Sequence, residues 1–151
     1  MSPKASLTIV GPGDNKARPA AASLRILIAD DDRDTAETLA TILRDEGHDV
    51  NTVLRGDEVI ALERGLRPQV LIVDINMPGM SGYAIAREVR QRRASGAPVM
   101  IGISGVWTKT SERSLAHAVG FDHYLLKPCE PSELIAILDR VAATPSRSAS
   151  V

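Results

Sequence analysis

The run Val70–Asp74 constrains the fold of this chain more than any other part of its sequence. Four apolar residues end there on one carboxylate, and Pro78, Gly79 and Gly82 follow closely. A continuous run of this kind predicts a strand buried on both faces, and the proline and glycines predict a tight turn directly after it. Asp74 therefore falls at the carboxyl end of a buried parallel strand, which is where ligands bind in open α/β sheets.

A second predicted strand also ends in acid. The segment Leu24–Ala29 runs directly into Asp30, Asp31 and Asp32. Carboxylates that converge on one edge repel each other unless they share a cation, and a few oxygen ligands open to water suit Mg²⁺. Acids also occur at a helix start because they complement its dipole, and we assign that role to Asp32 and Asp34. We interpret Asp30 and Asp31 as partners of the other acidic strand end in a cation site.

Strand and helix patterns alternate five times along the chain. We expect strands at residues 26–29, 49–53, 70–74, 98–103 and 123–126. We expect helices around residues 36–43, ending at Gly47, and at 57–64, 81–93, 110–119 and 131–142. Strict alternation predicts right-handed crossovers and an α/β fold, a doubly wound parallel sheet with helices on both faces. With the strand order 2-1-3-4-5, the two acidic strand ends meet where the chain reverses direction.

The domain organisation follows from length and composition. The chain has 151 residues, which suits one domain. Residues 1–23 are rich in Pro, Gly, Ala and Lys without periodicity, and residues 144–151 are short and polar. We therefore expect a flexible N-terminal arm, one folded domain over residues 24–143 and a flexible tail.

Charge and cysteine content exclude several classes of function. The net charge of −1 gives no electrostatic reason to bind nucleic acid. The single cysteine, Cys129, excludes an internal disulfide and a cysteine metal cage, and we expect a buried structural thiol in a reducing compartment. No stretch has the length of a membrane span or the pattern of a signal peptide. We therefore expect a cytoplasmic protein without nucleic-acid or membrane partners.

Two further strand ends add polar groups to the acidic edge. The fourth predicted strand is followed by Ser104 and the fifth by Lys127. A hydroxyl and an ammonium beside carboxylates suit phosphoryl transfer, in which protein groups and Mg²⁺ neutralise the charge of the transferred oxygens. No histidine or cysteine stands at a strand end, so the nucleophile would be a carboxylate that forms an aspartyl phosphate.

Taken together, these motifs resemble the receiver domain of two-component response regulators, in a form like the stand-alone chemotaxis regulators. The matching motifs are Asp30-Asp31, Asp74–Gly82 in the form D-x-x-M-P-G-M-S-G, Ser104-Gly105 and Tyr124-x-x-Lys127-Pro128. The similarity covers roughly Leu24 to Val141 and implies a flavodoxin-like fold. The stretch Gly120–Pro128 is similar to receivers of hybrid sensor kinases.

The resemblance implies a role for each matching residue. Asp74 corresponds to the phosphoacceptor, which takes a phosphoryl group from a histidine kinase. Asp31 corresponds to the direct Mg²⁺ ligand and Asp30 to its partner through water, while Asp74 and the backbone carbonyl of Asn76 complete the metal site. Lys127 corresponds to the lysine that pairs with the carboxylate and then with the phosphoryl group.

The resemblance also implies a switch. Ser104 corresponds to the hydroxyl that moves to the phosphoryl oxygen, and Tyr124 to the aromatic that then turns inward. The Lys127-Pro128 bond is typically cis in this family. The binding surface would lie on the fourth helix, fifth strand and fifth helix near Trp107. An apolar Val106 cannot orient an attacking water, so we expect a long-lived phosphoryl group.

Several functions fit these residues. The main hypothesis is a single-domain response regulator, not a turnover enzyme, whose phosphorylation controls the binding of a protein target. The alternatives are a phosphoryl shuttle between a hybrid kinase and a histidine phosphotransfer protein, and an interaction module that acts without phosphorylation. A Mg²⁺-dependent phosphohydrolase usually needs a second acid two residues after its nucleophile, where this chain has Asn76. The oligomeric state stays open, with a homodimer among the alternatives.

Two expectations concern helix faces. In the last helix we expect four apolar residues to face inward, namely Leu134, Ile135, Leu138 and Val141. In the third predicted helix, over residues 81–93, four arginines follow one another closely, and we interpret them as a solvated face: Arg87, Arg90, Arg92 and Arg93.

Overall fold

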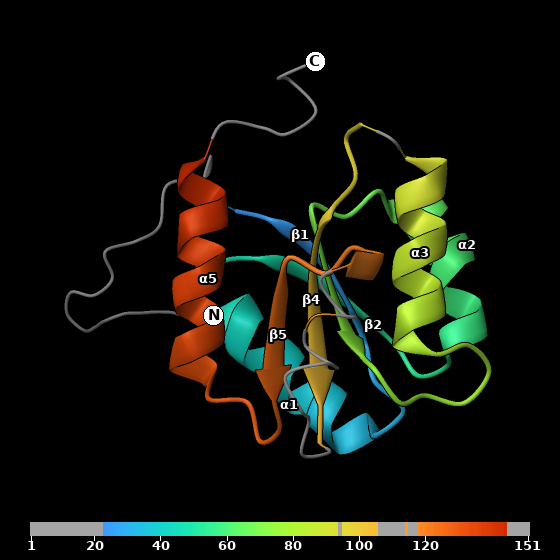
Figure 1. Ribbon diagram of the computed structural model, residues 1–151. Helices are drawn as coiled ribbons and strands as arrows, with labels where there is room; N and C mark the ends of the chain where they lie inside the picture. The colour runs from blue at the N-terminus through green and yellow to red at the C-terminus, as the bar shows by residue number, and fades with distance from the viewer. Residues whose placement is uncertain (1–22, 94, 106–113, 115–117, 145–151) are drawn as a thin grey trace, which may run out of the picture.

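The computed structural model describes residues 23–93, 95–105, 114 and 118–144 as one five-stranded parallel sheet with helices on both faces (Figure 1). The strands are β1 (Arg25–Ala29), β2 (Asp49–Val53), β3 (Val70–Asp74), β4 (Val99–Ser104) and β5 (His123–Leu126). The helices are α1 (Arg33–Asp45), the 3-10 helix η3 (Gly56–Glu58), α2 (Val59–Leu66), α3 (Gly82–Arg92) and α5 (Pro131–Ala143). The strand order is β2-β1-β3-β4-β5, which confirms the predicted fold class and order.

The sheet separates two hydrophobic layers. One layer packs α1 and α5 against the sheet, and the other packs α2 and α3 against the opposite face (Figure 1). All five residues of β3 are buried because this central strand has neighbours on both sides and helices over both faces. This burial is the reason for its continuous apolar sequence.

The predicted element boundaries agree with the structure except in detail. The helix predicted at residues 57–64 is divided into η3 and α2. In α5, Leu134 and Leu138 are buried as predicted, but Ile137 completes the buried face, while Ile135 and Val141 are only partly buried. Most of the helix predicted at residues 110–119 lies outside the described residues, and so do Val106 and Trp107.

The prediction that the arginines of residues 81–93 form a solvated face holds for Arg87 and Arg92, which are exposed, but is wrong for Arg90 and Arg93, which are only partly exposed. Arg92 and Arg93 both pair with Glu63 of α2, whose side chain is 0% exposed; the Arg92 Nη2 to Glu63 Oε1 distance is 3.1 Å. Arg90 pairs with Asp122 at 3.0 Å, just before β5. These arginines therefore hold neighbouring elements together.

No helix within the described ranges combines the length and the apolar character that a membrane span requires.

Candidate functional site

Three carboxylates meet at the carboxyl edge of the sheet. Asp30 follows β1 and Asp74 ends β3, and these strands are direct neighbours with Ala29 opposite Val73. One oxygen from each of Asp30, Asp31 and Asp74 lies within 4.8 Å of the others. Asp30 and Asp74 are buried and Asp31 is exposed, so the cluster opens to solvent on one side.

The turn into α1 holds this cluster in place. Asp32 is the N-cap of α1 and accepts hydrogen bonds from the amide of Asp34 at 3.2 Å and the hydroxyl of Thr35 at 2.7 Å. The hydrogen bond from Thr35 is the main cause that lowers the pKa of Asp32. The amide of Asp32 donates to Asp30 Oδ1 at 2.9 Å. Asp32 and Asp34 thus belong to the helix start, as predicted, and the amide of Asp32 orients the carboxylate of Asp30.

Lys127 is the one cation that contacts this cluster among the described residues. Its Nζ lies 3.0 Å from Asp30 Oδ2 and 3.1 Å from Asp74 Oδ2. Its amide donates to the Ser104 carbonyl at 2.8 Å, and the Lys127-Pro128 bond is cis, as the resemblance implied. Desolvation lowers the pKa of Lys127, but the hydrogen bonds to Asp30 and Asp74 outweigh it and leave the pKa raised. The ammonium group is therefore charged at neutral pH.

Asp74 lies in an environment that disfavours its charge. Its side chain is buried, with 6% of the residue exposed, and burial raises the pKa of its carboxyl above the usual value. Hydrogen bonds oppose this effect, because Oδ1 accepts from the Asn76 amide at 3.1 Å and Oδ2 accepts from Lys127. A cation bound at the cluster would stabilise the ionised carboxylate further.

The donor atoms fit a hard divalent cation. All three side chains offer carboxylate oxygens, and none of the described histidines or the cysteine joins them. Mg²⁺ prefers such ligands and keeps several waters, which the open side of the cluster admits. The backbone amide of Asn76 donates to Asp74, and the backbone carbonyl of Asn76 remains a predicted ligand of Mg²⁺.

A turn between β2 and α2 supports the loop after β3, which sequence reasoning missed. The Gly56 amide donates to the Pro78 carbonyl at 3.1 Å. A Cβ at Gly56 would lie 2.0 Å from the Met80 carbonyl oxygen, so only glycine fits. Gly79 has a φ of 91°, which favours glycine, and a Cβ there would lie 3.1 Å from Asp57 Cγ. A glycine between a predicted strand and helix is the sequence signal for this contact.

The two predicted switch residues lie on adjacent strands. Ser104 is 2% exposed at the end of β4 and directly follows Ile103, the register partner of Asp74. Tyr124 on β5 is half-buried against the layer formed with α2 and α3. The structure thus places the hydroxyl at the acidic edge, while the inward rotation of Tyr124 stays a prediction.

A cavity of about 490 Å³ opens beside the acids, between α1 and the segment after β5. Asp74 and Lys127 line it together with Thr38, Ile42 and Cys129. Cys129 is half-buried, less than predicted, and desolvation, assisted by Glu133 and Glu130, raises the pKa of its thiol. The cavity gives a reactant access to Asp74.

The sequence model of the response regulator receiver domain family matches residues 26–139. The chain belongs to this family. Receivers are signalling modules, not turnover enzymes, and they partner with histidine kinases. The acidic cluster of this receiver corresponds to the phosphorylation and metal site typical of the family.

Curated relatives and solved structures agree with this assignment. The DNA-binding response regulator MtrA of Mycobacterium tuberculosis is 37% identical over 112 residues, 74% of this chain and 47% of MtrA. An uncharacterised 14.6 kDa protein of Leptolyngbya boryana is 32% identical over 119 residues, 79% of this chain and 90% of the relative. The receiver thus spans about half the length of MtrA but nearly all of the smaller relative.

Two solved structures illustrate the shared fold. A putative response regulator from Chloroflexus aurantiacus is 30% identical, with a TM-score of 0.73 over 81% of this chain and 99% of the other. The chemotaxis response regulator CheY4 of Vibrio cholerae is 28% identical, with a TM-score of 0.72 over 79% of this chain and 98% of CheY4.

Proposed function

We propose that this receiver is a single-domain response regulator that accepts a phosphoryl group from a histidine kinase on Asp74. The observation that carries the proposal is the setting of this one carboxylate. It is buried, held by Lys127 and the Asn76 amide, and accompanied by two further acids within 4.8 Å. The two further acids and Lys127 distinguish Asp74 from an ordinary buried aspartate.

The transfer exchanges one bond for another. An oxygen of Asp74 attacks the phosphorus of the donor phosphohistidine, the P–O bond forms, and the P–N bond breaks with its electron pair left on the imidazole nitrogen. Lys127 pairs with the phosphoryl oxygens, as it pairs with Asp74 Oδ2 beforehand. Mg²⁺ bound by Asp30, Asp31, Asp74 and the Asn76 carbonyl would supply further neutralisation of phosphoryl charge.

The new dianion at Asp74 would drive the switch. It adds acceptor oxygens one register position from Ser104, whose hydroxyl can donate to them. Tyr124, on the strand next to β4, then fills the space that the hydroxyl leaves. The altered surface near Tyr124 binds the protein target, in line with other phosphorylation switches.

Intact-protein mass after incubation with acetyl phosphate and Mg²⁺ tests the first step. We expect one phosphoryl adduct on the wild type and on Asp34→Asn, which removes an exposed acid at the same edge. Asp74→Asn and a sample with EDTA should show none. If the folded wild type forms no adduct, the acidic cluster does not accept phosphoryl groups, and an interaction module independent of phosphorylation replaces this proposal.

A second experiment separates the binding switch from the phosphoryl shuttle. Phosphorylated receiver is mixed with a histidine phosphotransfer protein, and the phosphoryl group is followed on both proteins. Retention on the receiver, together with phosphorylation-dependent capture of a target, supports the switch. Rapid return to a histidine favours the shuttle between a hybrid kinase and a phosphotransfer protein.

A further inference from the structure

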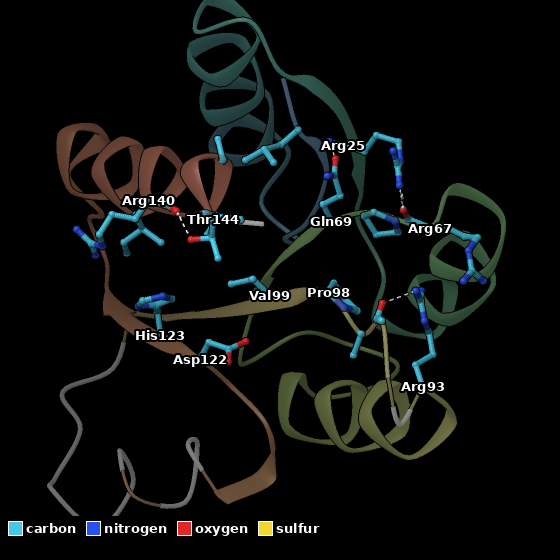
Figure 2. A pocket seen from close by; sticks show the side chains of 17 residues that line it. Arg25, Arg67, Gln69, Arg93, Pro98, Val99, Asp122, His123, Arg140 and Thr144 are labelled. Carbon is cyan, nitrogen blue, oxygen red and sulfur yellow. Dashed lines mark hydrogen bonds between the residues drawn. The ribbon is translucent and has the colours of Figure 1, made fainter. Parts of the chain in front are cut away.

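A second cavity lies at the amino edge of the sheet, on the side opposite to the acidic cluster (Figure 2). Its volume is about 590 Å³, within the range of ligand-binding clefts. The amino ends of the strands supply Leu24, Gln69, Val99 and His123 to its wall. The carboxyl ends of α2, α3 and α5 surround them. We call this cavity the amino-edge groove.

The charge of the amino-edge groove is positive. Four arginines line it, namely Arg25, Arg67, Arg93 and Arg140. Its one acid is Asp122, which already pairs with Arg90, and its Arg93 already pairs with Glu63. Within the described residues, the other three arginines have no carboxylate partner.

Helix ends explain these arginines only in part. Arg67 and Arg93 are the C-caps of α2 and α3, and Arg140 lies in the last turn of α5, where a cation complements the helix dipole. Arg25 uses its guanidinium to donate to the carbonyl of Arg67, at 3.1 and 2.9 Å. The guanidinium groups of Arg67 and Arg140 make no hydrogen bond to any described residue. Among the described residues, nothing competes with an external anion for these two groups.

The positions of these cations indicate an elongated partner. Figure 2 shows Arg25 and Arg67 on one side of the groove and Arg140 and His123 on the other. Cations on both sides suit an extended chain that carries several acids along its length. Guanidinium pairs with carboxylate through two parallel hydrogen bonds, so acidic side chains suit both ends.

The chemistry between the charged ends favours a peptide over a nucleic acid. Among the residues that line the groove there is no Phe, Tyr or Trp on which a base could stack. Aliphatic side chains lie there instead, including Leu24, Val99 and Val141. The chain's own residues 1–22 carry three basic side chains and one acid, which does not complement the groove. We propose that the amino-edge groove docks an acidic, aliphatic segment of a partner protein.

Fluorescence anisotropy with a labelled peptide of alternating Glu and Leu tests this proposal on the full chain. We expect binding that weakens with added salt, and at least about tenfold weaker binding to the double variant Arg67→Glu/Arg140→Glu. The matched control, Arg64→Glu/Arg87→Glu, makes the same change in net charge with exposed arginines outside the groove and should change affinity less than about twofold. Wild-type amide shifts at Gln69 and Val99 should change with the peptide.

Three outcomes would overturn the proposal. Equal weakening by both double variants would show general charge attraction without a site. Equal or tighter binding of a single-stranded oligonucleotide of the same length, with the same dependence on Arg67 and Arg140, would replace the peptide by a nucleic acid. Absence of peptide binding at low salt, with the protein folded, would remove the docking site. None of these results depends on phosphorylation of Asp74, so the proposed function is tested separately.

Discussion

The two edges of the sheet carry charges of opposite sign, and these charges differ in how far they are buried. At the carboxyl edge, Asp30, Asp31 and Asp74 lie around one lysine, and two of the three acids are buried. At the amino edge, arginines surround a cavity of similar size to the one beside the acids. Negative charge is concentrated and desolvated at one edge, whereas positive charge is spread over the rim of the other.

The helices account for the sign of each edge. In a parallel sheet of this kind the helices start at the carboxyl edge and end at the amino edge. Acids occupy the helix starts, with Asp34 in the first turn of α1 and Glu133 in that of α5. Basic residues occupy the last turns, including Arg44 and Arg140. Helix dipoles explain this sorting, but they do not explain a buried cluster of acids, which points to a cation and to chemistry.

Removal of Lys127 should have the largest effect at the carboxyl edge. We expect Lys127→Ala to slow adduct formation from acetyl phosphate by about 10²–10³-fold, because it removes a charge that stabilises the transferred oxygens. Arg67→Ala, at the other edge, should leave the rate within about twofold. The rate is measured by mass at saturating Mg²⁺. A normal rate in folded Lys127→Ala would show that its contacts with the acids are structural only.

The buried ion pairs of Glu63 should govern stability and not chemistry. We expect Glu63→Gln to lower the free energy of unfolding by about 3 kcal/mol, since Arg93 loses its carboxylate partner and Arg92 keeps only the longer contact with Glu88 at 3.9 Å. Urea titration measures this loss, with exposed Glu37→Gln as the control. The folded fraction should form the adduct at the normal rate. A large fall in that rate would show that the ion pairs of Glu63 also affect the chemistry at the acidic edge.

A side chain at Gly56 should disturb the acidic edge from outside it. We expect Gly56→Ala to displace the loop at Pro78 and Met80, destabilising the domain by about 1–3 kcal/mol and weakening Mg²⁺ binding roughly tenfold. Mg²⁺ titration and urea unfolding measure the two effects. Gly65→Ala is the matched control, because a Cβ there meets nothing within 4 Å. Equal Mg²⁺ affinity in both variants would limit Gly56 to a structural role.

Neutralising Asp74 should produce the smallest of these effects, with the opposite sign. Burial raises the pKa of Asp74 in the fold, so its contribution to stability is present below the usual pKa of aspartate and is lost as pH rises through the folded pKa. Without Mg²⁺ at pH 7, the free energy of unfolding of Asp74→Asn should therefore be slightly higher than that of the wild type. The difference should shrink towards pH 3. Mg²⁺ should stabilise the wild type more than the variant, and a less stable variant at pH 7 would contradict this account.

The acidic edge was predictable because its signals are local. An apolar run indicates each strand, and Asp30 and Asp74 follow such runs directly. The strand order then brings the two acids together without any knowledge of side-chain packing. The motif match added the pairing with Lys127, which the structure extends to Asp30 as well as Asp74.

The contacts that were missed join residues far apart in the sequence. The partners of Glu63 lie on another helix, so its burial depends on how α2 packs against α3 and not on its own surroundings in the chain. The same holds for Gly56 and the loop after β3. Short-range patterns identify a helix or a turn, but they do not tell which of its polar residues an adjacent element will bury.

The most direct test of the central claim is to identify the residue that carries the phosphoryl group. Borohydride reduces an aspartyl phosphate to homoserine, so the treated phosphoprotein can be digested and each acid examined by peptide mass spectrometry. We expect homoserine at position 74 alone, with Asp30 and Asp31 unchanged. Homoserine at either of those two acids, or a phosphorylated protein without homoserine, would contradict the assignment of Asp74 as the phosphoacceptor.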